Sequence, residues 1–214
     1  MWMQQGQKSS FMDAQELYAL ILVQYPKTGE YQVCDLHKPC AESRKCSSSA
    51  SSRFINFDEV KIEVDKGNKN KNRASVDAIT VSGNKFCFVE IKGWMEYLKH
   101  NKPKEEKIKK QASSYNLYEK FRASEDICAE IAKHSELFRE IPEVFVLVTD
   151  IDVNTNGIES FQHNLLALSE TGSDWMSLCN ESLNYELNKQ ITSVPKYYID
   201  CRHLEKAMKE IENL

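Results

Sequence analysis

Three charged residues stand at the ends of a short, mostly apolar stretch, "VDAITVSGNKFCFVEIKGW" (residues 76–94): Asp77 near its start, and Glu90 and Lys92 near its end. Hard cations such as Mg²⁺ take oxygen ligands and are usually held by one or two carboxylates together with substrate phosphate. A lysine beside such an ion could orient or deprotonate an attacking water, or stabilise charge on a phosphate. These three residues therefore suggest metal-assisted phosphodiester hydrolysis, if the fold brings them together.

The middle of this stretch, Gly83-Asn84, predicts a two-residue type II′ turn between two antiparallel strands. That turn fixes the pairing, so that Asp77 faces Glu90 and Ser75 faces Lys92. Because side chains alternate between the two faces of a strand, the three charged residues continue an apolar face. That face holds Ile79, Val81, Phe86 and Phe88, and the other face is apolar too, with Val76, Ala78, Cys87, Val89 and Ile91. We expect the hairpin to be covered on both sides.

Two carboxylates directly opposite each other on a sheet are destabilising unless positive charge lies near them. Two readings of the pattern follow. In one, Lys92 alone neutralises Asp77 and Glu90, and the set is a salt-bridged end of a hairpin. In the other, a divalent metal ion lies between the two acids.

The elements that would position these residues can be read along the chain. An amphipathic helix is predicted over residues 10–25, with Ser10 as its cap. The alternation of Val60, Ile62 and Val64 with charged residues predicts a strand over residues 53–65. The opening hairpin then completes a three-strand meander.

A helix is predicted next over residues 101–121, followed by a second helix that Ser124 caps. The continuous apolar run over residues 143–150 predicts a strand buried on both faces. A last strand is predicted from residue 196, followed by a closing helix. This order indicates an α/β domain in layers, with a single domain over residues 1–214.

These features together resemble the PD-(D/E)XK, or restriction-endonuclease-like, nuclease superfamily, which has an acid on one strand and (D/E)-x-K on the next. Here the pattern is Asp77, then Glu90-Ile91-Lys92, although Val76 stands where the namesake proline would be. The RecB-like branch of that family adds Gln-x-x-x-Tyr on the following helix, which corresponds to Gln111 and Tyr115. The resemblance covers roughly residues 10–150, and residues 151–214 would be a C-terminal extension packed on that core.

The resemblance implies a restriction-endonuclease-like core, a central mixed sheet of the meander plus a parallel strand, flanked by helices. It implies that Asp77 and Glu90 hold Mg²⁺ or Mn²⁺, with Lys92 and Gln111 as the other catalytic residues. Many members take a further acid from the first helix, for which Glu16 is the first candidate and Glu59, on the first predicted strand, the second. The implied activity is that of a metal-dependent nuclease, favouring DNA over RNA. The alternative is an inactive nuclease-like domain that binds nucleic acid or a protein partner.

Basic residues lead into the proposed site. Residues 1–123 carry 21 Lys and Arg against 15 Asp and Glu, whereas residues 124–214 carry 7 against 17. The loop "KGNKNKNR" at residues 66–73 contains no acid, so it could grip phosphates near Asp77. Its basic residues are Lys66, Lys69, Lys71 and Arg73, and we group them with Tyr115 as candidate nucleic-acid contacts.

A second candidate metal site lies between residues 27 and 53, a long loop. Cys34, His37, Cys40 and Cys46 are four ligands of the kind that zinc takes, within thirteen residues. Their spacing lacks the paired Cys-x2-Cys form, so an ordinary Ser- and Cys-rich loop is the competing reading.

Composition limits where the protein could work. The seven cysteines are an odd number and are spread along the chain, which favours reduced thiols and a cytoplasmic location over a disulfide framework. The longest apolar run, at residues 17–23, is too short to span a bilayer. We expect no membrane association, and a homodimer stays open.

Overall fold

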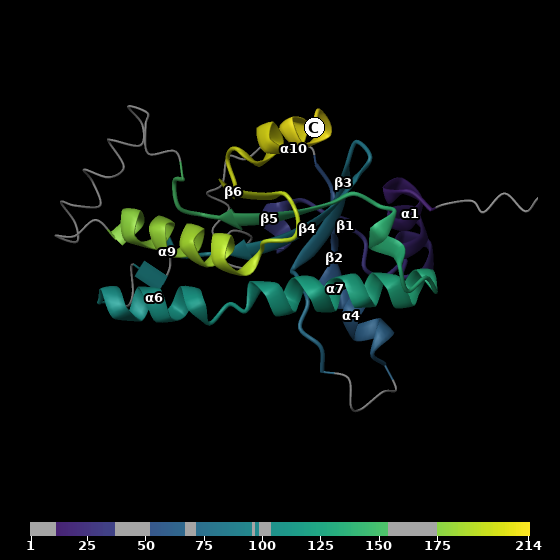
Figure 1. Ribbon diagram of the computed structural model, residues 1–214, viewed down its shortest axis with the longest axis horizontal. Coiled ribbons are helices and arrows are strands. Elements are labelled where there is room, and N and C mark those ends of the chain that lie inside the picture. Colours follow the sequence, from purple (N-terminus) through teal and green to yellow (C-terminus); the bar gives the residue numbers. More distant parts are fainter. Residues whose placement is uncertain (1–11, 37–51, 67–71, 96, 99–103, 154–174) are drawn as a thin grey trace, which may run out of the picture.

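The computed structural model describes residues 12–36, 52–66, 72–95, 97–98, 104–153 and 175–214. It has an α/β fold in which helices cover both faces of one mixed sheet (Figure 1). No helix in these ranges is both long and apolar enough to cross a membrane.

The sheet has six strands in the order of the sequence. The first four strands pair antiparallel, and β4, β5 and β6 are parallel to one another. The carboxyl ends of β4, β5 and β6 therefore lie at the same edge. Their bounds are β1 Glu30–Tyr31, β2 Phe54–Asn56, β3 Ala78–Ser82, β4 Lys85–Lys92, β5 Glu143–Thr149 and β6 Lys196–Asp200.

The helices, in chain order, are α1 Ala14–Gln24, α2 Val33–Leu36, α4 Phe57–Val64, α6 Glu105–Ser113, α7 Leu117–Ala132, α9 Trp175–Gln190 and α10 Leu204–Glu212, with a short 3₁₀ helix at Leu137–Arg139. The mixed sheet with a meander and a parallel strand is confirmed. The strand and helix predicted from residue 196 onward are confirmed as β6 and α10.

The β3–β4 hairpin has the predicted register, with Ile79 opposite Phe88 and Val81 opposite Phe86. Of the two turn residues only Gly83 has a positive φ, 59°, as the first position of a type II′ turn requires. A side chain at Gly83 would also meet the backbone of Glu212 at the end of α10.

Both faces of the hairpin are buried, as predicted. Ile79, Phe86 and Phe88 belong to a large core formed with α1, α4, α6, α7 and α9. Ala78, Cys87 and Val89 belong to a smaller core on the other face, which α10 covers with Leu204, Met208 and Ile211. Figure 1 shows α7 and α10 on opposite sides of the sheet. The exception is Val76, which precedes β3 and joins the larger core.

The predicted strand over residues 53–65 is wrong beyond Asn56, where the chain turns into helix α4. The Asn56 side chain accepts a hydrogen bond from the backbone N–H of Glu59, 3.3 Å away, and so caps the helix. Phe57 and Val60 are buried and Ile62 is 58 % exposed, which fits a helical face and not an alternating strand.

Two predicted helix boundaries are also wrong. The helix of residues 101–121 divides at Asn116, which has a left-handed conformation (φ 49°), and α7 begins at Leu117. Ser124 is therefore inside α7 and not its cap. In α1 the cap is Asp13 and not Ser10: Asp13 and Glu16 form a reciprocal capping box.

Candidate active site

Four charged side chains meet at the carboxyl end of β4. Asp77 immediately precedes β3, Glu90 and Lys92 are on β4, and Lys120 comes from the first turn of α7. The Glu90 side chain is fully buried, whereas those of Lys92, Asp77 and Lys120 are 14 %, 24 % and 24 % exposed. The cluster is thus at a rim, with Glu90 at its base.

Ammonium groups bridge the two acids. Lys120 Nζ lies 2.5 Å from Glu90 Oε1 and 3.7 Å from Asp77 Oδ1. Lys92 Nζ contacts the same Glu90 oxygen and lies 3.6 Å from Asp77 Oδ2. Because a single ammonium group reaches both carboxylates, the two acids are within reach of one ion. The prediction that Asp77, Glu90 and Lys92 come together agrees with this geometry.

The antiparallel ladder ends at Ala78–Val89, one residue before Asp77. The Asp77 carboxylate instead accepts a hydrogen bond from the backbone N–H of Ile91, at 2.6 Å, which fixes Oδ2 toward β4. Ser75, predicted to face Lys92, lies beyond the ladder and donates to Asp58 Oδ1 at 2.5 Å.

Burial makes the charge on Glu90 costly. Burial first, and the neighbouring Asp77 second, raise the pKa of Glu90, and the two lysines offset them only in part. Burial alone would lower the pKa of Lys92, but Glu90 and Asp77 raise it above its usual range. The ammonium form of Lys92 is therefore favoured, while the two lysines only partly offset the effect of burial on Glu90.

One oxygen of the Glu90 carboxylate lacks a hydrogen-bond donor in the described chain. Within the described part of the chain, Oε2 is buried and has no hydrogen-bond partner, although Oε1 contacts both lysines. A buried carboxylate oxygen without a donor costs free energy, so such atoms are rare in native proteins. A cation held by Asp77 and Glu90 would remove this deficit.

The donor set fits a hard cation, with two carboxylates and no soft ligand among the four side chains. Among the residues that the structure describes, no group of three or more His, Cys, Asp or Glu side chains could hold a metal ion. One or two carboxylates, together with substrate phosphate, are the usual ligands of Mg²⁺.

Tyr115 completes the site. Its half-buried ring lies under Lys92, with Nζ 4.9 Å from the ring centroid, and packs edge-on against Trp94. Burial raises the pKa of Tyr115, and a hydrogen bond from the Gln111 side chain acts in the opposite direction. Gln111 is exposed on α6 and interacts with Tyr115, whose ring contacts Lys92.

Lys120 was not found by sequence reasoning. A signal was present: Lys120 lies one residue from Phe121 on the helical stripe of Leu117, Phe121 and Ser124, all buried, where a lysine needs a partner. Ser124 fixes this turn of α7, because its hydroxyl donates to Lys120 O (2.8 Å) and accepts from Val76 N (2.9 Å).

Glu16 does not join the site. Its carboxylate caps its own helix, accepting from Asp13 N at 3.0 Å. The adjacent Gln15 donates to Gly83 O at 3.1 Å, which places this end of α1 at the turn of the hairpin. At about 3.3 Å per residue, the turn is about 20 Å from Asp77.

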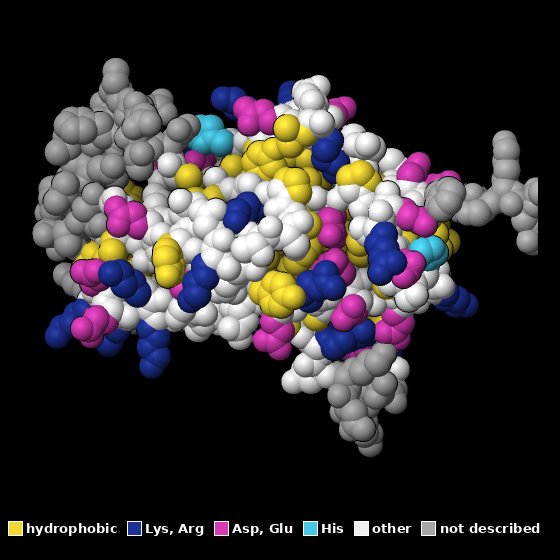
Figure 2. All heavy atoms as spheres, in the orientation of Figure 1, with side chains coloured by type: hydrophobic (Ala, Val, Ile, Leu, Met, Phe, Trp, Pro, Cys, Tyr) yellow, Lys and Arg dark blue, Asp and Glu magenta, His cyan; other side chains and the backbone are white. Residues whose placement is uncertain are grey.

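The described members of the basic loop are paired with acids. Lys66 lies 2.8 Å from Glu63. Arg73 contacts Asp65 and lies 2.9 Å from Glu130, so it ties the end of α4 to α7. Lys69 and Lys71 lie outside the described residues. On the face shown in Figure 2, described Lys and Arg side chains are interspersed with Asp and Glu.

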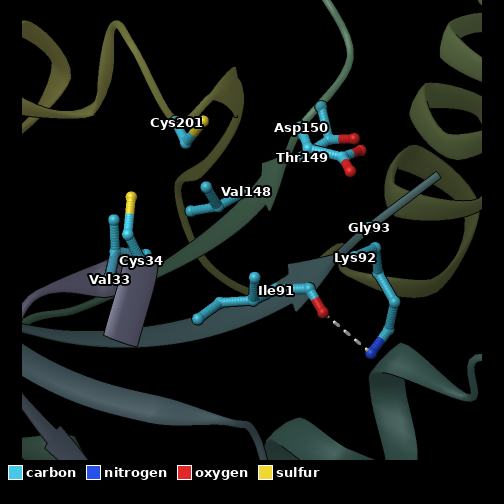
Figure 3. Close-up of a pocket in the computed structure, with 9 residues that line it drawn as sticks. All are labelled: Val33, Cys34, Ile91, Lys92, Gly93, Val148, Thr149, Asp150 and Cys201. Carbon is cyan, nitrogen blue, oxygen red and sulfur yellow. Dashed lines mark hydrogen bonds between the residues drawn. The ribbon is translucent and has the colours of Figure 1, made fainter. Parts of the chain in front are cut away.

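For the candidate zinc site, only Cys34 is in the described part of the chain, and His37, Cys40 and Cys46 lie outside it. Cys34 is in α2 and lines a small hollow at the carboxyl ends of β4 and β5, with Cys201 on the far wall (Figure 3). Lys92 is also among the residues that line this hollow, and its Nζ donates to Ile91 O at 3.2 Å.

Comparison with known proteins finds no matching family model, no matching curated protein and no matching solved structure.

Proposed function

We propose that the protein is a metal-dependent nuclease that hydrolyses phosphodiester bonds, in DNA rather than RNA. One observation carries the proposal. The fully buried Glu90 has an oxygen without a donor in the described chain, opposite Asp77 and beside Lys92, at the edge where three strands end.

In this proposal Asp77 and Glu90 hold Mg²⁺ or Mn²⁺. The bound ion would lower the pKa of a water and neutralise charge on the reacting phosphate. Lys92 lies beside both carboxylates, where it could stabilise negative charge on the phosphate or orient the attacking water. Tyr115 holds Lys92 in place, and Gln111 acts through Tyr115.

The choice of DNA rests on the family resemblance and on the basic first half of the chain. Arg73 is paired with Asp65 and Glu130, so its described contacts hold the end of α4 against α7. Lys66 is paired only with the neighbouring Glu63 in the described chain and is largely exposed, so it could still contact phosphate. A cytoplasmic location remains part of the proposal, in keeping with the buried thiols of Cys87, Cys128 and Cys179.

The decisive experiment incubates the protein with plasmid, linear duplex and single-stranded DNA, each with Mg²⁺, Mn²⁺ or EDTA. Cleavage is expected with the metals and not with EDTA. Glu90→Ala and Lys92→Ala should each reduce the rate at least about 100-fold, as removal of one group that stabilises transition-state charge does. Lys110→Ala, at an exposed position of α6, is the control and should cut at the wild-type rate.

A second candidate function follows from the charge balance of the cluster. Two ammonium groups already oppose two carboxylates, which is what a nuclease-like domain that binds without cutting would retain. Its partner would be nucleic acid or another protein. DNA binding without cleavage under every metal condition would establish this function and exclude the first.

A further inference from the structure

Two ammonium groups compete for one oxygen in the candidate active site. Lys92 and Lys120 both contact Glu90 Oε1, while Glu90 Oε2 has no donor in the described chain. Two donors on one oxygen and none on the other is an unusual arrangement of hydrogen bonds for a fully buried carboxylate.

We propose that Lys120 substitutes for the divalent cation in the metal-free protein and is exchanged for it when the cation binds to Asp77 and Glu90. This inference rests on the proposed function, since it assumes that the acidic pair is a metal site. The ammonium group of Lys120 contacts both acids from α7, a different element, as a shared cation would.

Of the two lysines, Lys120 is the one that can leave. Lys92 is held by the Tyr115 ring and by Ile91 O, and its side chain is 14 % exposed. The ammonium group of Lys120 contacts the two carboxylates and interacts with Lys92, and its side chain is 24 % exposed. Lys120 therefore has a path to solvent and gives up no aromatic contact.

The exchange changes the charge of the site. Without metal, two carboxylates and two ammonium groups balance. With a divalent cation in place, the cation and Lys92 exceed the two acids by one positive charge, and the released Lys120 remains at the rim. Phosphate is then attracted only after the metal has bound. By linkage, bound phosphate must strengthen metal binding by the same factor.

The test measures metal affinity by calorimetry on the full chain, without nucleic acid, using Mg²⁺ and then Mn²⁺. Removing the competing ammonium in Lys120→Met should tighten binding by about tenfold, within the usual range of coupling between two ligands. Lys120→Arg keeps the charge and should bind no tighter than the wild type. Lys110→Met is the matched surface control and should leave the affinity unchanged.

Folding is checked by thermal denaturation of the same variants. Lys120→Met should have a lower Tm than the wild type without metal, and a larger increase in Tm when Mn²⁺ is added. If Lys120→Met does not fold, Lys120→Gln replaces it.

Equal or weaker metal binding by Lys120→Met would overturn the exchange. The proposed function would survive that result if Glu90→Gln abolished binding in the wild-type background. Absence of metal binding in the wild type and in Lys120→Met would overturn both. Binding by Lys120→Met alone would support the exchange.

Discussion

Lys92 is the residue whose surroundings most restrict the chemistry. It lies against two carboxylates and over an aromatic ring, and these contacts act in the same direction, toward the ammonium form. Burial alone would lower the pKa of Lys92. Here the acids outweigh burial and raise that pKa, so the ammonium form is favoured as long as no cation neutralises the acids.

The contact between Lys92 and the Tyr115 ring can be tested by mutation of Tyr115. Tyr115→Leu removes the ring, and a cation–π contact is worth about 0.5–2 kcal/mol. If the contact serves to hold Lys92 for the reaction, kcat/KM should fall by about 2- to 30-fold. Tyr115→Phe keeps the ring and should react at nearly the wild-type rate.

The control is Tyr118→Leu, three residues farther along and 53 % exposed. It should have no effect on kcat/KM. Equal losses in Tyr115→Leu and Tyr115→Phe would show that the hydroxyl, and not the ring, matters.

Prediction from sequence succeeded at this scale where the geometry is local. Asp77, Glu90 and Lys92 lie within sixteen residues of one another around a turn whose length fixes the register of β3 and β4. The turn therefore brings the three residues close together, and the hydrogen bond from Ile91 N–H places the Asp77 carboxylate. Lys120 lies thirty residues from Glu90 on a separate helix. The position of Lys120 beside Glu90 depends on how α7 packs across the sheet, and no local sequence pattern predicts that packing.

At the scale of elements, the contact between the start of β3 and α7 determines whether the site forms. Val76 N–H is buried, lies next to Asp77, and donates to the Ser124 hydroxyl of α7. The same hydroxyl donates to Lys120 O. A single side chain thus connects the segment that carries one acid with the helical turn that carries one lysine.

Ser124→Ala should lower the free energy of unfolding by about 1–3 kcal/mol, because it leaves the Val76 N–H buried without an acceptor. Urea denaturation measures this loss. Ser182→Ala is the matched control: Ser182 is also buried in a helix, but the hydrogen bond that the structure gives its hydroxyl goes to Leu178 O of the same helix. It should cost less than about 1 kcal/mol. Equal losses in the two variants would argue against the special role of Ser124.

Two segments were predicted wrongly because their local sequence pattern fits more than one structure. Residues 57–64 alternate as a strand does, but Val60 also follows Phe57 at helical spacing, and the Asn56 cap decides between the two periods. In the segment around Asn116, the pattern of Ile108, Ala112 and Tyr115 continued into Tyr118, so the left-handed residue between two helices was not visible. The strand of residues 143–149 was predicted because a continuous apolar run has no helical alternative of that length.

At the scale of the whole molecule, side chains of α7 take part in two acidic pairs, which lie at opposite ends of the parallel strands. Near its start Lys120 meets Asp77 and Glu90, where β4 ends. Farther along, Glu125 lies beside Glu143, the first residue of β5, and Arg122 lies 2.7 Å from Glu125. The two pairs differ in how their charge is compensated. Two ammonium groups oppose the first, while burial and Glu125 raise the pKa of Glu143 to about 8, so a proton compensates the second.

The second pair predicts how stability depends on pH. The folded pKa of Glu143, about 8, lies above its ordinary value of 4.5, so the folded protein binds more protons than the unfolded chain between these values. The stabilisation from the protonated carboxyl is complete below pH 4.5 and is lost as pH rises through 8. Glu143→Gln stays neutral, so relative to the wild type it should gain stability as pH rises from 5 to 9. Because Glu143 is partly exposed and Arg122 screens it, the gain should be about 1–2 kcal/mol, less than the full shift would give.

Urea denaturation of both proteins at pH 5, 7 and 9 measures the difference, with Glu140→Gln, an exposed glutamate three residues earlier, as the control. The control should follow the wild type at every pH. A constant difference between Glu143→Gln and the wild type would show that Glu143 is ionised throughout, and would assign the compensation of this pair to Arg122 instead of a proton. Substitution at this end of the strands should leave the metal binding that we propose for Asp77 and Glu90 unchanged, because the two pairs lie at opposite ends of the parallel strands.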